Sequence, residues 1–301
     1  MSQSRNPNSG AVHGLLLIDK PAGVSSAGVV REVKRRLGGV KVGHLGTLDP
    51  FATGLLPLGL GEGLKIVQFL NQEGKAYSGV IALGSTTDTL DSTGRVTQSA
   101  PIPPDVESRL DEVSARFRGE IQQVPPMYSA IKKDGTPMYE LARKGVEVDL
   151  EPRTVTIDEL SIAAESPQAL RIEVRCSKGT YVRSLARDVA AALGTLGHLS
   201  SLRRTAFGRF DVGRASPLES VLESGDPAVI SPRDALTDFR EIAADDAMIR
   251  QIRLGRQYAL SELPPPRGHQ EIVKVIGTDG ALVALLGVAG SAWKILRVLA
   301  P

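Results

Sequence analysis

Gly-His-Leu-Gly-Thr-Leu-Asp-Pro-Phe-Ala-Thr-Gly-Leu-Leu-Pro, residues 43–57, is the stretch on which the rest of the chain depends, and it has the character of a loop. Pro50 pushes Asp49 away from helical geometry, while the three glycines of the stretch permit positive φ or the close approach of another segment. Apolar neighbours such as Leu48 and Phe51 shield one side of the carboxylate. A shielded carboxylate costs free energy unless another group pairs with it. Asp49 is therefore a candidate functional acid, and a simple turn cap is the alternative interpretation.

The composition is that of an ordinary globular protein, with 42% hydrophobic and 23% charged residues in a chain of 301. This length predicts one large domain and a small appendage. No apolar run reaches membrane-spanning length and no signal-peptide core is present, so we expect no membrane segment. The single cysteine, Cys176, excludes an intramolecular disulfide and suits the reducing cytoplasm. The four histidines lack the spacing of metal ligands, so we expect no metal site.

The charges are unevenly distributed although the formal net charge is only +2. Between Arg171 and Arg209 there are eight Lys or Arg against two acids, and between Glu219 and Asp246 there are eight acids against two Arg. The stretch that starts near Arg31 is also basic. One basic surface and one acidic surface would match a phosphate-backbone footprint. The alternative is a set of solvated helix faces.

The N-terminal half alternates short apolar runs with loops. Residues 1–10 are polar and are expected to be disordered. The pattern predicts strands at 15–18, 55–60 and 75–84, a helix capped near Ser25 and ended by Gly38-Gly39, a short helix at 62–70 and a polar loop at 85–91.

The middle of the chain predicts an amphipathic helix at 104–118 and strands at 154–162 and 170–176. Between them, two adjacent prolines and mixed charges indicate an excursion from the core. A further helix follows, with Thr180 as its expected N-cap. Arg183 then falls in the first turn, where the helix dipole disfavours a cation by about 0.3–1 kcal/mol. Such a placement indicates a role away from the helix itself.

The C-terminal segment reads as a separate small unit. A helical piece at 249–255 is followed by three prolines at 264–266, a hairpin of 271–276 with 281–288, and a last strand at 293–299.

Five stretches resemble the motifs of the TruB-type pseudouridine synthases of bacteria, which isomerise the uridine at position 55 of tRNA. The stretch 43–54 resembles the catalytic motif, whose aspartate falls on Asp49. Residues 19–26 resemble Asp-Lys-Pro-x-Gly-x-Ser-Ser, residues 75–91 resemble the second motif, and residues 179–183 and 202–205 resemble Gly-Thr-Tyr-x-Arg and Leu-Arg-Arg-Thr.

The resemblance implies a role for each matched residue. Asp49 is catalytic and Arg183 pairs with it. The other implied roles are these: Lys20 and Pro21 buttress the catalytic loop, His44 fills in against displaced nucleotides, Tyr77 and Tyr181 contact the extruded base, Leu202 lines its pocket, and Arg203 and Arg204 approach the RNA backbone. Without the resemblance, Lys20 would be a surface lysine, Tyr77 a core or rim residue and Arg183 an exposed helix arginine.

The same resemblance implies an α+β fold, with a mixed, largely antiparallel sheet flanked by helices and a small β-rich C-terminal domain of PUA type. The catalytic domain would span 11–246 with an RNA-clamping insertion at about 124–152, and the PUA-like domain would span 247–301. The implied partner is the T stem-loop of tRNA. We expect a cytoplasmic monomer without cofactor.

Other functions stay open at this level. A tRNA-binding or folding module would need the basic face and not the carboxylate. A hydrolytic glycosidase would cleave the same bond, but the sequence shows no second well-placed acid near Asp49. For the isomerase, the carboxylate acts either as a nucleophile on base or sugar, or on the C2′ proton by a glycal route.

Overall fold

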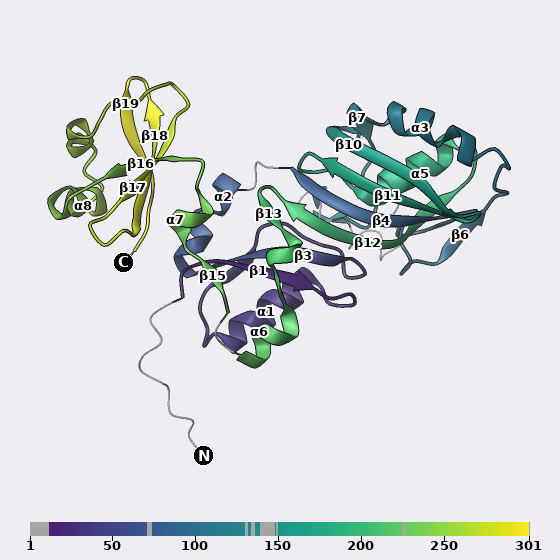
Figure 1. The fold of residues 1–301 in the computed structure, drawn as a ribbon, viewed down its shortest axis with the longest axis horizontal. Helices are drawn as coiled ribbons and strands as arrows, with labels where there is room; N and C mark the ends of the chain where they lie inside the picture. Colours follow the sequence, from purple (N-terminus) through teal and green to yellow (C-terminus); the bar gives the residue numbers. More distant parts are fainter. Residues whose placement is uncertain are drawn as a thin grey trace, which may run out of the picture.

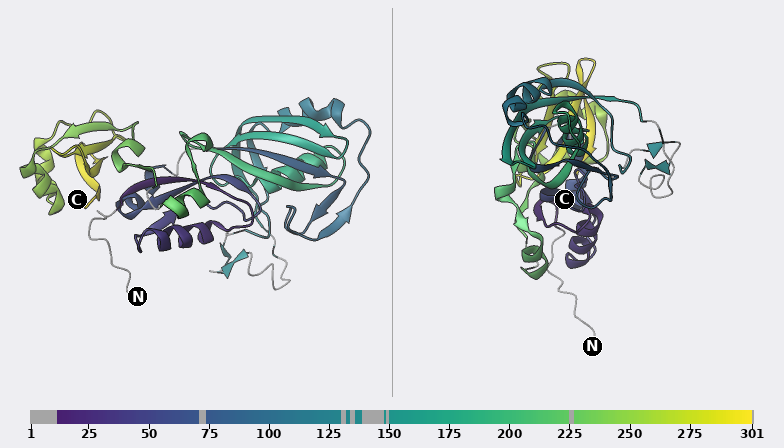
Figure 2. Two further views of the ribbon diagram at one scale, coloured as in Figure 1. Left: turned by 60° about the horizontal axis from the view of Figure 1, so that its bottom comes forward. Right: turned by 90° about the vertical axis from the view of Figure 1, so that its right-hand side faces the viewer.

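In a computed structural model of the chain, the described residues are 12–70, 74–129, 132–133, 136–138, 148, 150–224 and 227–300. They form an elongated molecule with a large curved sheet and a separate four-stranded sheet at one end (Figures 1 and 2). The expected N-terminal tail and most of the expected insertion lie outside the described residues.

The main sheet has eleven strands. In spatial order its principal strands are β14 (Ser216–Pro217), β1 (Gly14–Lys20), β3 (Thr53–Leu60), β12 (Gly197–Phe207), β4 (Lys75–Leu83), β11 (Ala169–Cys176), β10 (Arg153–Ser166) and β7 (Gly119–Gln123). The short strands β2 (Val42–His44), β13 (Phe210–Asp211) and β15 (Val229–Ile230) pair with β3, β12 and β1. Only β1 with β14 and β3 with β12 run parallel. The predicted mixed, largely antiparallel sheet is confirmed.

Helices cover the sheet in two places (Figure 1). One group lies against the β1 and β3 half, and the other lies inside the curve of β12, β4, β11 and β10. The helices are α1 (Ser26–Arg36), α2 (Val67–Leu70), α3 (Leu110–Arg116), α5 (Val182–Ala192), α6 (Leu218–Ser224) and α7 (Pro232–Ala235), with 3₁₀ turns η1 (Gly61–Lys65), η2 (Glu107–Arg109) and η3 (Val212–Arg214).

The N-cap of α1 agrees with the sequence-based prediction, whereas the N-cap of α5, the other of the two longest helices, does not. The side chain of Ser25 caps α1 by accepting from the Gly28 amide, and Val29 and Val33 are buried. For α5 the structure corrects the expected cap, because the N-cap is Tyr181 and not Thr180. The Thr180 hydroxyl donates instead to the carbonyl of Ser177. The amide of Tyr181 donates to Oε1 of the buried side chain of Gln123.

The main core lies between the sheet and these helices. Alternate residues of β11 are buried, as the alternation predicted, and they pack with apolar residues of α5 such as Leu185 and Val189. This packing sets the position of the first turn of α5, which carries Arg183, relative to the sheet.

Several element boundaries differ from the predictions. The helix expected at 104–118 is limited to η2 and α3, and the one expected at 62–70 is split into η1 and α2. The start of the expected excursion is β7, which extends the main sheet. The expected polar loop begins with β5 (Ser85–Thr87), which pairs with β6 (Val96–Ser99), and a second small ladder joins β8 (Lys132–Lys133) to β9 (Thr136–Pro137).

The C-terminal unit is a sheet in the order β16 (Arg240–Ala243), β17 (Ile272–Ile276), β18 (Leu282–Ala289) and β19 (Ala292–Val298), with α8 (Asp246–Arg253) and the 3₁₀ segment η4 (Gln257–Glu262). The hairpin and the last strand are as predicted. The expected boundary at residue 247 is wrong, because β16 pairs in parallel with β17 and already belongs to this sheet.

Candidate active site

Asp49 lies in the loop between β2 and β3, and its side chain is one-third exposed. The amide of Ala52 bonds to the carbonyl of Asp49, which closes a turn around Pro50. Gly54, the second residue of β3, has φ +99°, and a Cβ at this position would lie 2.3 Å from the carbonyl oxygen of Arg204. A glycine is therefore required where this loop enters the sheet beside β12.

One side of the loop is anchored by residues of the Asp19–Ser26 motif. Lys20 is fully buried, and its ammonium donates to the carbonyl oxygens of Pro21, Val24 and Pro50 at 2.8, 2.8 and 3.2 Å. Burial lowers the pKa of Lys20 to about 8, and the charge of Asp49 opposes this shift. The hydroxyl of Ser26 donates to the Leu48 carbonyl at 2.9 Å and accepts from the Leu48 amide at 2.8 Å. These contacts fit the expected buttressing role of Lys20.

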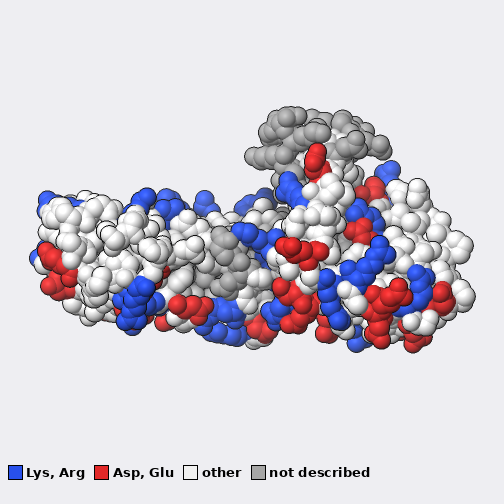
Figure 3. Space-filling view, turned by 90° about the horizontal axis from the view of Figure 1, so that it is seen from above, with Lys and Arg blue, Asp and Glu red and all other residues white. Residues whose placement is uncertain are grey.

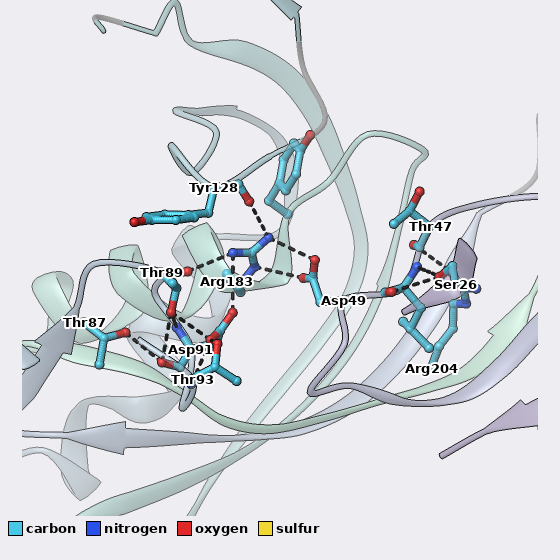
Figure 4. A network of polar contacts seen from close by, with 12 residues as sticks. Ser26, Thr47, Asp49, Thr87, Thr89, Asp91, Thr93, Tyr128, Arg183 and Arg204 are labelled. Carbon is cyan, nitrogen blue, oxygen red and sulfur yellow. Dashed lines mark hydrogen bonds and ion pairs between the residues drawn. The ribbon is translucent and has the colours of Figure 1, made fainter. Parts of the chain in front are cut away.

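Arg204 holds the other side of the loop. Its guanidinium is fully buried and donates to the carbonyl oxygens of Leu55, Thr47 and Gly46 (Figure 4). The sequence-based expectation that Arg204 approaches the RNA backbone is contradicted, because the residue is fully buried and these three hydrogen bonds go to carbonyl oxygens of the protein itself. Arg203 points elsewhere and forms a two-pronged pair with Asp19, at 3.0 and 2.7 Å.

Arg183 reaches Asp49 from the first turn of α5, as expected (Figure 4). Its Nη2 donates to Oδ1 of Asp49 at 3.1 Å, and its Nε lies 2.9 Å from Oδ2. Only 5% of the Arg183 side chain is exposed, so this is not a surface pair. The same guanidinium donates to the carbonyl oxygens of Tyr128 and Thr89.

A second carboxylate, Asp91, was not anticipated from the sequence. Its Oδ2 lies 3.5 Å from Nη1 of Arg183, and its side chain is 6% exposed. Its Oδ1 accepts from the hydroxyl of Thr89 and from both the amide and the hydroxyl of Thr93. The spacing Thr-x-Asp-x-Thr was the available signal, since hydroxyls two residues away on each side can fix a carboxylate.

These contacts have opposing effects on Asp49. Burial raises the pKa of Asp49, Arg183 lowers it, and Asp91 raises it again, with a net upward direction. Arg183 thus stabilises the ionised form of Asp49, whereas Asp91 opposes ionisation and fixes the orientation of the guanidinium.

A cavity of about 230 Å³ opens over Asp49. Tyr77, Tyr181, Arg183 and Leu202 line it, so the structure brings together four of the residues selected from the sequence. Burial raises the pKa values of both tyrosines. With one carboxylate, one guanidinium, the ammonium of Lys75 and walls that are about half apolar, the cavity suits a planar polar ring beside an anion.

His44 and Pro21 occupy different surroundings from these four residues. His44 is on β2, is half-buried and is not among the residues that line this cavity. Burial and the nearby charge of Arg204 lower the pKa of His44. Pro21 lies beside Lys20 and Arg203 at the edge of another, open cleft. Across the described ranges, no group of three or more His, Cys, Asp or Glu is arranged to hold a metal ion.

The fold has counterparts among solved structures. The chain superposes with a TM-score of 0.69 on a chain of an H/ACA RNP bound to a substrate RNA containing 2′-deoxyuridine, at 23% identity, covering 96% of this chain and 86% of the other. A chain of a Cbf5-Nop10-Gar1 complex gives 0.69 at 24% identity, covering 99% and 92%. The shared fold and the carboxylate cleft define the class, which is the pseudouridine synthase fold.

Sequence comparison then gives the family. Residues 34–182 match the model of the TruB family pseudouridylate synthase N-terminal domain. The chain is 47% identical over 251 residues to tRNA pseudouridine synthase B of Azoarcus sp. (strain BH72), covering 82% of this chain and 83% of that protein. It is 44% identical over 288 residues to the protein of that name from Cupriavidus pinatubonensis, covering 92% and 90%. The chain belongs to the TruB family of pseudouridylate synthases, and it is an isomerase.

Proposed function

We propose that this chain converts the uridine at position 55, in the T-loop of tRNA, to pseudouridine. The observation that carries the proposal is the Asp49–Arg183 pair at the base of a cavity lined by Tyr77, Tyr181 and Leu202. The relatives named tRNA pseudouridine synthase B support tRNA as the substrate.

The reaction breaks the N1–C1′ bond of the uridine and forms a C5–C1′ bond, and the proton lost from C5 balances the one gained at N1. Asp49 acts either as a nucleophile or as the base for the C2′ proton, and both routes require its ionised form. Arg183 serves either route by stabilising that form and by fixing the carboxylate in one orientation.

The uridine must leave its stack to enter the cavity. The volume of about 230 Å³ is far below that of a stem-loop, so only an extruded nucleotide fits beside Asp49. Tyr77 and Leu202 supply flat and apolar contacts for the extruded base. His44 would then contact the nucleotides displaced at the mouth, and recognition of the arm would depend on shape and phosphates.

The phosphate contacts need a basic surface. In Figure 3, Lys and Arg side chains follow the upper edge of the left half of the molecule, while both signs of charge are interleaved over the right half. The uneven distribution seen in the sequence therefore does not translate into one uniformly basic face in this view.

We propose that the C-terminal domain extends the RNA surface, and that the enzyme acts as a cytoplasmic monomer. Among the described residues, no helix is long and apolar enough to cross a membrane.

The test uses an unmodified tRNA transcript and a matched transcript with cytidine at position 55. Carbodiimide mapping should detect pseudouridine at that position in the first transcript only. Asp49→Asn should abolish product while tRNA affinity stays within a few fold, because the amide keeps the shape of the side chain but is neither nucleophile nor base. Product from purified Asp49→Asn would refute the assignment of Asp49. Unaltered binding by an inactive wild-type protein would favour a tRNA-binding module, and release of free uracil would favour a glycosidase.

A further inference from the structure

Lys75 is a cation at the active-site cavity to which neither the motifs nor the mechanism assigns a role. It is the first residue of β4, two positions before Tyr77. Residues two apart on a strand project from the same face of the sheet. Lys75 and Tyr77 accordingly both line the cavity over Asp49.

Among the described residues, the charge of Lys75 is not neutralised by a carboxylate, in contrast to the charges of Arg183 and Arg203. Arg183 has Asp49 and Asp91, and Arg203 has Asp19. Over the described part of the chain, by contrast, no carboxylate lies within ion-pair distance of the Lys75 ammonium. Its nearest charge-related contact is the ring of Phe207, whose centroid is 5.2 Å from Nζ.

The surroundings make this position costly for a cation. The guanidinium of Arg204 contacts the same Phe207 ring, with Cζ 5.6 Å from the centroid, so two cations share one aromatic ring. Burial lowers the pKa of Lys75, and the charge of Arg204 lowers it further. A cation–π contact is worth about 0.5–2 kcal/mol, less than a paired carboxylate supplies in a partly buried site.

The ammonium lies against the loop that carries Asp49. A Cβ placed on Gly46 would lie 3.5 Å from Nζ of Lys75 and 3.3 Å from the Phe207 ring, so the loop backbone passes directly over both. A position that is unfavourable for the free protein, in the same cavity as the proposed reactive carboxylate, is typical of a group that meets its partner in the substrate.

We infer that Lys75 is a substrate-binding residue that supplies positive charge to an anionic oxygen of the extruded nucleotide. This inference rests on the proposed function. The oxygen belongs either to a phosphate of that nucleotide or to a carbonyl of the uracil. When the N1–C1′ bond breaks, its electron pair moves to the uracil ring and is shared by the carbonyl oxygens. It returns when the C5–C1′ bond forms. Lys75 transfers no proton in this sequence, and its charge alone lowers the energy of the anion.

The test compares Lys75→Met with Lys75→Arg, which keeps the charge, and with Arg116→Met. Arg116 is an exposed cation in the last turn of α3 and does not line the cavity, so its loss controls for net charge. tRNA affinity is measured over a range of salt concentrations, and the rate of a single turnover is measured with all tRNA bound.

The two sources of the oxygen give different results. For a phosphate, Lys75→Met weakens binding and reduces the slope of log affinity against log salt by about 0.7–0.9, with an unchanged single-turnover rate. For a uracil oxygen, affinity is unchanged and the single-turnover rate falls by about 100-fold. In either case Lys75→Arg retains most of the wild-type tRNA affinity, salt slope and single-turnover rate. If Lys75→Met and Arg116→Met have the same tRNA affinity, the same salt slope and the same single-turnover rate, the inference is overturned.

A chemical rescue keeps the test decisive if Lys75→Met folds poorly. In Lys75→Cys, alkylation with 2-bromoethylamine restores an ammonium of nearly the original length. The sole native cysteine, Cys176, lies opposite position 75 on β11, so the rescue is made in a Cys176→Ala background, where no disulfide with the new cysteine can form and only the new cysteine reacts. Recovery of rate or affinity on alkylation supports the inference, and equal values before and after alkylation contradict it. Failure of the wild-type protein to modify the tRNA would instead refute the proposed function.

Discussion

Arg183 lies between two carboxylates, and the two have unequal surroundings. Asp49 is one-third exposed and faces the cavity, whereas Asp91 is buried and bonded to two threonines. The guanidinium is therefore fixed from behind by Asp91 and by two backbone carbonyls, and it presents its remaining edge to Asp49. One arginine thus influences both the ionisation and the direction of the Asp49 carboxylate, which we propose to be the reactive group.

This arrangement predicts that loss of Arg183 and loss of Asp91 shift the pH-rate profile of the wild-type protein in opposite directions. Turnover should rise with pH as Asp49 ionises. Arg183 lowers the pKa of Asp49, so Arg183→Met should shift this rise to higher pH and reduce the plateau by about 100-fold. Asp91 raises the pKa of Asp49, so Asp91→Asn should shift the rise to lower pH.

The measurement is the rate of single turnovers from pH 4 to 9, with Arg183→Lys included. Lysine restores the charge but not the planar two-pronged geometry, so the position of the rise should recover more than the height of the plateau. Superimposable profiles for all four proteins would mean that neither residue controls Asp49. Shifts in the same direction for Arg183→Met and Asp91→Asn would show that both act only through folding.

The sequence predicted the Asp49–Arg183 contact but missed Asp91 and misassigned Arg204. The contact was predicted because the resemblance to the TruB-type motifs implied it. The local positions of the two residues, one before a proline in an apolar loop and the other in the first turn of a helix, only marked each as a candidate functional residue. Asp91 sits in a polar stretch that gives no such conflict. Arg204 lies in a strand with a basic neighbour, and only the three-dimensional path of the Gly46–Leu55 backbone shows that its donors point inward.

At the scale of elements, the start of α1 serves both the helix and the catalytic loop. Ser25 and Ser26 are adjacent, yet they bond in different directions. Ser25 accepts from Gly28 within the helix, whereas Ser26 makes both of its bonds to the backbone of Leu48, next to Asp49. The position of the loop is therefore tied to the position of the helix.

The two serines form a matched pair for mutation. Ser25→Ala removes a helix cap and should lower the free energy of unfolding by about 1 kcal/mol without changing turnover. Ser26→Ala leaves two buried backbone groups of Leu48 without partners, which costs about 1–3 kcal/mol, and it should also slow single turnovers. Urea unfolding and single-turnover rates measure the two effects. Equal losses of rate in both variants would show that the loop responds to helix stability alone.

Element boundaries were harder to predict than element types, for a physical reason. The N-cap of α5 is Tyr181, which makes no side-chain capping bond, and its amide donates to Oε1 of the buried Gln123 on β7. A contact with a strand residue 58 positions earlier in the chain leaves no local signature. Likewise β7 joins the sheet only by pairing with β10, whose position depends on β11 and β4.

At the scale of the whole molecule, the two sheets share a hydrophobic core. Apolar residues of the catalytic part, among them Leu15 and Ile66, pack in one cluster with residues of the C-terminal sheet such as Leu285 and Leu299. Polar contacts reinforce this boundary, including Lys65 with the carbonyl of Val298 and Glu62 with the amide of Ala300. The three prolines at 264–266, which the sequence indicated as a break, lie within the C-terminal unit between η4 and β17, and the apolar contact joins that unit to the catalytic part.

Leu285 and Leu286 test this shared core because they are adjacent on β18, are both fully buried and face opposite sides. Leu285 packs in the cluster shared with the catalytic part, and Leu286 packs in the cluster confined to the C-terminal unit. Each change to alanine should lower the free energy of unfolding by about 2–5 kcal/mol. The two variants should differ in the region of the structure whose backbone amides lose protection from hydrogen exchange.

Hydrogen exchange of backbone amides measures that location. Leu285→Ala should speed exchange in β1 and η1 of the catalytic part as well as in β18, because the cavity lies between the two sheets. Leu286→Ala should speed exchange only in α8 and the C-terminal sheet, because its neighbours belong to that unit. If both substitutions left β1 and η1 fully protected, the two sheets would be independently stable and the shared cluster would contribute little. Because β1 ends at Lys20, which supports the Asp49 loop, Leu285→Ala should also slow turnover, whereas Leu286→Ala should leave the bound single-turnover rate unchanged.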